Sequence, residues 1–160
     1  MVHTFLGTIN VRIMPGYARY KELAMIIDKD IKETMHVIVG SCYDVYKELH
    51  GGLLEKAYED CLCYELRLRK HDPQQQVDVP LWYKGVKIGR SYKLDLLVDN
   101  RIILELKAVE ELAPEHRMQL FNYMRLSKMT YGMLINFSKD HGVKFERYYL
   151  DRNTNNCMIF

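Results

Sequence analysis

Residues 92–112, YKLDLLVDNRIILELKAVEEL, contain two apolar runs on either side of the polar tripeptide Asp99-Asn100-Arg101. Each run has the length of a strand, and so short a connection predicts an antiparallel hairpin. The unbroken series Ile102-Ile103-Leu104 indicates a central strand covered on both faces. Burying an unpaired charge costs several kcal/mol unless the charge finds a partner or a metal ion. Asp95 nevertheless lies inside the first run, and Glu105 and Lys107 lie inside the second, so these three residues are the first candidates for function.

The rest of the chain shows two kinds of apolar spacing: helical spacing and the alternation typical of strands. Apolar residues recur every three or four positions over residues 26–49 and 53–70, which predicts two amphipathic helices. Pro114 opens a third helix that runs to Ser127. Extended patterns predict further strands at residues 76–83, 86–89, 131–137 and 143–150. We therefore expect a mixed α/β (α+β) fold with a central mixed β-sheet flanked by helices.

Length and composition predict one domain. The chain has 160 residues, close to the size of a single domain. We expect residues 1–19 to form a loose N-terminal arm, residues 20–152 the domain, and residues 153–160 a polar C-terminal tail. No segment approaches the ~20 apolar residues of a membrane span, and the N-terminus lacks a secretory pattern, so a cytoplasmic protein without a membrane partner is expected. Four scattered cysteines predict reduced, buried thiols.

The register of the expected hairpin decides whether its charged residues meet. A three-residue loop pairs Val98 with Ile102 and places Asp95 opposite Glu105 on the same face, whereas a two-residue loop would separate them. Lys107 shares the face of Glu105 because the two are two positions apart. Facing carboxylates repel unless a cation lies between them, and Mg²⁺ is a hard cation that carboxylate oxygens bind. The alternative is a buried ion pair that serves only structure, and the local pattern does not separate the two.

Four motifs along the chain together resemble one known family. In chain order they are Gly52-x-x-Glu55-x-x-Tyr58, Leu94-Asp95, Glu105-Leu106-Lys107 and Gln119-x-x-x-Tyr123. Their order and expected secondary structure resemble the PD-(D/E)XK nuclease superfamily, and most closely its branch of small proteins named after the GxxExxY motif. Leu94 stands where the superfamily name has proline. The resemblance runs from about Ile27 to Leu150 and implies a restriction-endonuclease-like core.

The resemblance implies a metal-dependent site in which each motif residue has a role. It makes Asp95 and Glu105 metal ligands, with the backbone carbonyl of Leu106 as the third. Glu55 matches an acidic residue that the superfamily points into the site from a helix, and it is a further candidate ligand. Lys107 corresponds to the catalytic lysine. The implied cofactor is Mg²⁺, with Mn²⁺ as a substitute.

The motif residues on the expected helices have functional and structural interpretations. Gln119 and Tyr123 match the QxxxY element of RecB-like nucleases, which positions the substrate or the catalytic lysine, and Tyr58 is a supporting residue one turn after Glu55. Without the resemblance, Glu55 is a first-turn acid that stabilises a helix N-terminus. The two tyrosines are then core aromatics with a hydroxyl at the rim, and Gln119 is a surface residue.

Charge is distributed in blocks that the net value of +2 conceals. The net charges are −3 over residues 1–66, +5 over 67–93, −4 over 94–116 and +4 over 117–152. The acidic block contains the expected metal site, and basic blocks flank it. Clustered cations are typical of phosphate-binding surfaces, although a solvated face is the simpler alternative. The candidates for binding nucleic acid are Arg67, Arg69, Lys70, Lys84, Lys87, Arg90 and Lys93.

These observations lead to a nuclease that hydrolyses phosphodiester bonds of nucleic acid, with DNA favoured over RNA by family analogy alone. The alternative is a non-cleaving nucleic-acid-binding or assembly module that retains the nuclease fold. A third interpretation is a purely structural ion-pair cluster. The small size leaves substrate specificity to be supplied by a homodimer or by a protein partner.

Overall fold

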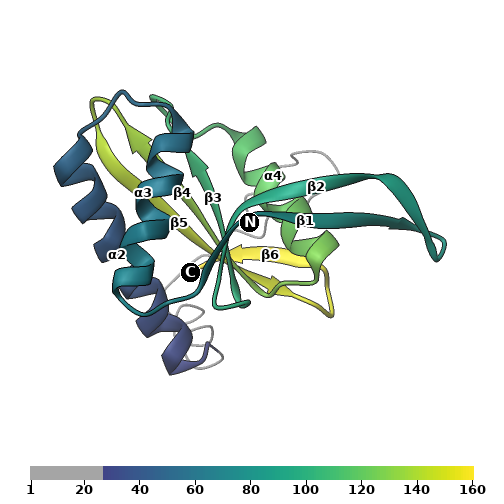
Figure 1. The fold of residues 1–160 in the computed structure, drawn as a ribbon. Coiled ribbons are helices and arrows are strands. Elements are labelled where there is room, and N and C mark those ends of the chain that lie inside the picture. Colours follow the sequence, from purple (N-terminus) through teal and green to yellow (C-terminus); the bar gives the residue numbers. More distant parts are fainter. Residues whose placement is uncertain (1–26) are drawn as a thin grey trace, which may run out of the picture.

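The computed structural model describes residues 27–160, and Figure 1 shows a six-stranded sheet with helices on both faces. The elements in chain order are α2 (Lys29–Leu49), α3 (Glu55–Leu68), β1 (Pro73–Tyr83), β2 (Val86–Val98), β3 (Ile102–Lys107), α4 (Pro114–Ser127), β4 (Tyr131–Ser138), β5 (Gly142–Asp151) and β6 (Asn156–Ile159). The strands lie in the order β1-β2-β3-β4-β5-β6. Strands β3 and β4 are parallel, and every other neighbouring pair is antiparallel. This mixed sheet flanked by helices confirms the expected α/β fold class.

Helices cover the two faces of the sheet unequally. Helices α2 and α3 bury apolar stripes against one face, with Ile31, Met35 and Ile38 at helical spacing along α2. The crossover helix α4 covers the other face, where Leu120 and Met124 belong to a second buried cluster. Two cores therefore sandwich the central strands. All four cysteines are free, and Cys61 is the one that is only half-buried.

Strand β3 is the central strand that its unbroken apolar series predicts, since all six of its residues are buried. Its antiparallel partner β2 meets it through a three-residue turn, and Val98 is paired with Ile102. Asp99 and Asn100 both have positive φ, at 53° and 55°, a conformation that Asp and Asn adopt more readily than most residues. The predicted register is confirmed, and it carries Asp95 and Glu105 toward one face.

Two segments differ from the sequence-based expectation. The apolar runs before and after Gly89 belong to one continuous strand, β2, because a local irregularity in the pairing beside Pro80 is absorbed without ending the strand. Residues 153–160 are not a tail: the polar residues before Asn156 form a turn, and β6 pairs with β5. Strand β6 also buries Cys157 (0% exposed), a signal that its polar neighbours hide in the sequence. The expected N-terminal arm, residues 1–19, lies outside the described residues.

None of the helices described within residues 27–160 combines the length and the apolar character that crossing a membrane requires.

Candidate active site

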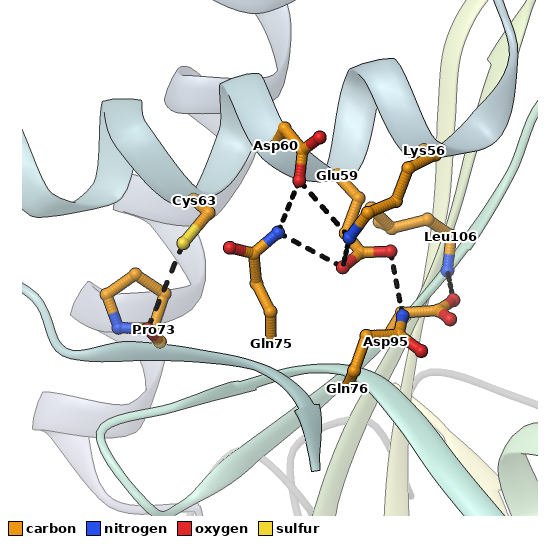
Figure 2. Close-up of polar contacts among 9 residues, drawn as sticks. All are labelled: Lys56, Glu59, Asp60, Cys63, Pro73, Gln75, Gln76, Asp95 and Leu106. Atoms are coloured by element: carbon orange, nitrogen blue, oxygen red, sulfur yellow. Dashed lines mark hydrogen bonds and ion pairs between the residues drawn. The ribbon is translucent and has the colours of Figure 1, made fainter.

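The charged residues of the central strands come together beside the start of α3. Asp95 lies on β2, Glu105 and Lys107 lie on β3, and Glu55 is the first residue of α3. Strand pairing is regular up to Leu96 and Leu104, and one further step places Asp95 opposite Glu105. Asp95 Oδ2 accepts a hydrogen bond of 2.8 Å from the backbone N–H of Leu106 (Figure 2). That bond fixes the Asp95 carboxylate against β3.

Glu105 is a fully buried carboxylate with an unfilled bonding position. Its side chain has 0% exposure, and its Oε1 accepts a 2.5 Å hydrogen bond from Lys107 Nζ. Its other oxygen, Oε2, is buried without a hydrogen-bond partner among the described residues. Burial, together with the nearby Asp95 carboxylate, raises the pKa of Glu105 to about 8 in spite of Lys107. The Glu105 carboxyl therefore keeps a proton at neutral pH, and a bound cation would take the place of that proton.

The pKa values of the neighbouring ionisable groups are shifted as well. Burial raises the pKa of Asp95, and hydrogen bonds from the Leu106 N–H and the Gln76 side chain only partly oppose it. Burial also raises the pKa of Glu55, against the attraction of Lys107. For Lys107 burial alone would lower the pKa, but the bond to Glu105 and the nearby carboxylates outweigh it and raise the pKa. One ammonium therefore faces three carboxyl groups whose pKa values are all raised, so each of them favours a bound proton or a bound cation.

The residues at this site fit a hard divalent cation bound by few protein ligands. Within residues 27–160, no three His, Cys, Asp or Glu side chains are placed to hold a metal ion together. In this structure Glu55 does not complete a group of three carboxylates with Asp95 and Glu105, and its role as a ligand stays a prediction. Two carboxylates and a carbonyl oxygen are nevertheless an ordinary set for Mg²⁺, which retains several waters. Glu105 Oε2, which has no hydrogen-bond partner in the described part of the chain, provides an acceptor for such an ion.

A second layer of polar residues, which the sequence analysis missed, supports Asp95 from the α3 side (Figure 2). Glu59 is 3% exposed and accepts hydrogen bonds from Lys56 Nζ at 2.7 Å, Gln75 Nε2 at 3.1 Å and Gln76 Nε2 at 2.9 Å. Gln76 has a φ of 52° and interrupts the regular β1–β2 pairing, so its side chain reaches both Glu59 and Asp95. The sequence signal was the glutamine run on a predicted strand and the acid one turn after Glu55.

The Gly52-x-x-Glu55-x-x-Tyr58 motif is explained by the loop before α3. Gly52 has a φ of +100°, which disfavours any residue with a Cβ. Tyr58 is buried and stacks on Phe137, with ring centroids 4.5 Å apart. Its hydroxyl donates to the carbonyl of His50 at 2.7 Å and accepts from the N–H of Leu53 at 3.2 Å. Tyr58 thus holds the loop that places Glu55 beside the site, which is a supporting role.

Helix α4 brings the expected pair Gln119 and Tyr123 to the same region. Gln119 Nε2 donates to the Tyr123 hydroxyl at 3.0 Å. Burial raises the pKa of Tyr123, and the charges of Glu105 and Asp95 add to that effect, so the hydroxyl lies near both carboxylates. At the start of the same helix, His116 Nδ1 accepts a 3.0 Å hydrogen bond from the Ala113 N–H. That bond makes His116 a helix cap.

The expected nucleic-acid-binding cations separate into two groups. Three of them, Arg67, Arg69 and Lys70, lie at the C-terminal end of α3, about 20 Å along the helix from Glu55. Arg69 is occupied there by ion pairs with Asp44 and Glu65. The others lie on the outer part of the β1–β2 hairpin and are exposed: Lys84, Lys87, Arg90 and Lys93. The structure therefore does not join all seven into one surface.

Comparisons with known proteins support the resemblance at the level of the superfamily. A family model described as PD-(D/E)XK nuclease superfamily matches residues 32–148, which include all four motifs. A search of curated proteins finds no match. Among solved structures, one titled "Crystal structure of SSO0001" is similar, with 19% sequence identity and a TM-score of 0.47. The match covers 63% of this chain and 51% of that chain, so this protein spans about half the length of that structure.

Proposed function

The chain belongs to the PD-(D/E)XK nuclease superfamily, and from that membership we propose that it hydrolyses phosphodiester bonds of nucleic acid with the help of a divalent metal ion. The observation that carries the proposal is that the half-buried Asp95 meets the buried Glu105 and Lys107 on one face of the central strands. Glu105 has there an oxygen without a hydrogen-bond partner among residues 27–160, and the carboxyl groups outnumber the ammonium. A purely structural ion pair explains neither the oxygen without a partner nor the excess of carboxyl groups.

Each residue has a distinct part in the proposed reaction. Asp95, Glu105 and the Leu106 carbonyl would hold Mg²⁺ or Mn²⁺, which activates water and neutralises phosphate charge when bound. Lys107 keeps its proton because Glu105 and the other carboxylates raise its pKa. Its ammonium is therefore available to stabilise negative charge that develops on the phosphate.

Finer features of the family assignment are part of the same proposal. Membership of the GxxExxY branch is supported by the loop that Gly52 and Tyr58 build before Glu55. A RecB-like positioning role for Gln119 and Tyr123 is supported by their mutual hydrogen bond and by the nearness of Tyr123 to the carboxylates. DNA remains the proposed substrate by family analogy, and a homodimer or protein partner the proposed source of specificity. The cytoplasm remains the proposed location, by the composition argument.

The test is a cleavage assay with matched variants. Single-stranded, duplex and branched DNA, and RNA of the same sequences, are incubated with the protein and Mg²⁺, Mn²⁺ or EDTA. We expect metal-dependent cleavage that Lys107→Ala and Asp95→Asn lower by roughly 10²–10⁴-fold. The exposed Lys144→Ala serves as the lysine control. Equal rates for all variants would assign the activity to a contaminant. Nucleic-acid binding without cleavage under every condition would favour the non-cleaving module.

A further inference from the structure

The outer part of the β1–β2 hairpin projects beyond the body of the molecule, past α4 (Figure 1). We call residues 80–93 the arm. Strands β1 and β2 are joined at its tip by the two-residue turn Lys84-Gly85, in which both residues have positive φ, at 49° and 79°. Such a turn matches the twist of the two strands and forms a regular hairpin end. The arm is therefore a defined two-stranded ribbon with solvent on both faces.

Large apolar side chains lie exposed along the arm. Trp82 and Tyr83 beside the tip are 59% and 62% exposed, and Tyr92 at the base is 43% exposed. Directly opposed residues of an antiparallel pair share a face, so Trp82 lies with Lys87 on one face while Tyr83 lies with Val86 on the other. Each face of the tip thus offers an aromatic ring to solvent, and exposed apolar surface of this kind marks an interaction site.

The charge of the arm specifies the kind of partner. Residues 80–93 contain four cations and no acidic residue. Lys93 forms an ion pair of 3.2 Å with Asp78. Lys84, Lys87 and Arg90 form no ion pair with any carboxylate of the described chain, and Lys84 Nζ lies 5.4 Å from the centroid of the Tyr83 ring. A surface of aromatic rings interleaved with cations suits a polyanion with exposed flat rings, and a second copy of the arm would be repelled by the same charge.

The base of the arm leads directly into the active site. Strand β2 continues from Tyr92 to Asp95, a distance of about 10 Å along the strand. The Tyr92 ring lies 6.0 Å from the Tyr123 ring, measured between centroids, and Tyr123 bonds Gln119 beside the carboxylates. A chain that followed the arm inward would arrive at Asp95.

We propose that the arm binds single-stranded nucleic acid, with unpaired bases stacked on Trp82 and Tyr83 and phosphates held by Lys84, Lys87 and Arg90. Stacking of a base on an aromatic ring is favourable for every base and needs the base to be unpaired. The cations add a salt-dependent attraction that does not depend on sequence. This inference rests on the proposed function only for the choice of nucleic acid as ligand, because binding on the arm requires neither metal nor cleavage.

The chain contains one tryptophan, so the emission of Trp82 reports directly on the arm. The protein in EDTA is titrated with oligothymidine and with a duplex of equal length. We expect the single strand to quench Trp82 emission and to bind more tightly than the duplex. In fluorescence anisotropy with labelled oligothymidine, Trp82→Ala should weaken binding about 10- to 100-fold, and Trp82→Phe should restore most of it. Tyr64→Ala, a substitution at an equally exposed ring outside the arm, should have no effect.

The outcomes separate this inference from the nuclease proposal. Oligothymidine binding that leaves Trp82 emission unchanged, or that Trp82→Ala does not weaken, would overturn the inference even if cleavage is observed. Trp82 emission that changes with protein concentration alone, with a dimer seen by light scattering, would assign the arm to self-association and also overturn it. Arm binding without metal-dependent cleavage would retain the inference and reject the nuclease. Equal melting temperatures of the variants show that the exposed substitutions leave the fold intact.

Discussion

Replacing Glu105 with glutamine should make the metal-free protein more stable at neutral pH. The physical reason is proton linkage. The pKa of Glu105 lies at about 8 in the folded chain, against an ordinary value of 4.5 that applies when the chain is unfolded. Between these values the folded chain keeps a proton that the unfolded chain has released. Glu105 therefore contributes stability that is fully present below pH 4.5 and is lost as the pH rises to about 8.

The size of the effect follows from the same two values. Each pH unit above 4.5 lowers the stability of the wild-type protein by about 1.4 kcal/mol, so the loss reaches roughly 3 kcal/mol at pH 7. Glutamine has nearly the shape of the protonated acid and does not titrate in either state. Its added amide hydrogens meet a buried position without a described partner, which costs about 1 kcal/mol. The expected net gain at pH 7 is about 2 kcal/mol, or about 6 °C in melting temperature for a chain of this size.

Thermal unfolding in EDTA from pH 4.5 to 8, with wild type and Glu105→Gln side by side, measures this gain. The exposed Glu111→Gln is the isosteric control. The advantage of Glu105→Gln should grow with pH and pass through zero at about pH 5, below which the cost of the unpartnered amide leaves the variant slightly less stable. Mn²⁺ should stabilise the wild type alone. If Glu105 and Lys107 instead formed a charged structural pair, the variant would be less stable at pH 7. That result, or a difference that does not depend on pH, would refute the reasoning.

Three further substitutions test the scaffold of the site. Tyr58→Phe keeps the ring stack but loses the hydroxyl bond to His50, so urea unfolding should show a loss of about 1 kcal/mol in the free energy of unfolding. Nuclease activity should fall by a larger fraction than stability, because the same bond holds the loop before Glu55. Asn136→Ala should cost about 2–4 kcal/mol, because the buried amide both donates to and accepts from the backbone of Val109 just after β3; a loss below 1 kcal/mol would contradict this. Gly132→Ala would place a Cβ 2.7 Å from Met124 Sδ, and thermal unfolding should show a loss of about 1–3 kcal/mol through overpacking. An unchanged melting temperature would show that α4 moves aside without cost.

The sequence predicted the elements whose signals are local. Charged residues inside apolar strands made Asp95, Glu105 and Lys107 the candidates for the site. The three-residue turn predicted the pairing of Val98 with Ile102, which the structure confirms. Strand β6 was missed because Cys157 is its one fully buried apolar residue and polar residues precede it. A burial pattern of one residue cannot be distinguished from a tail without knowing that β5 presents an open edge.

Contacts between distant segments were beyond the reach of the pattern. Glu59 and Gln76 meet where Gln76 has a left-handed conformation (φ 52°) and leaves the β1–β2 pairing, and no spacing rule predicts that contact. The projection of the arm was missed for a similar reason. The alternating pattern predicted the hairpin correctly, but how far the hairpin extends past the helices that pack on its base is a tertiary property. Arg69 was assigned to nucleic acid because its partner Asp44 lies on another helix.

Strand β1 lies at the edge of the sheet and includes part of the arm. An exposed edge that carries apolar side chains is a template on which other chains can add strands and start aggregation. Pro73 and Pro80 lack the N–H that an added strand would need, and the left-handed Gln76 breaks the straight run between them. The lysines at positions 84 and 87 add charge next to the apolar tip. The backbone of β1 thus opposes the addition of strands from other chains. The exposed side chains of the arm can then bind a specific partner without making this edge a site of aggregation.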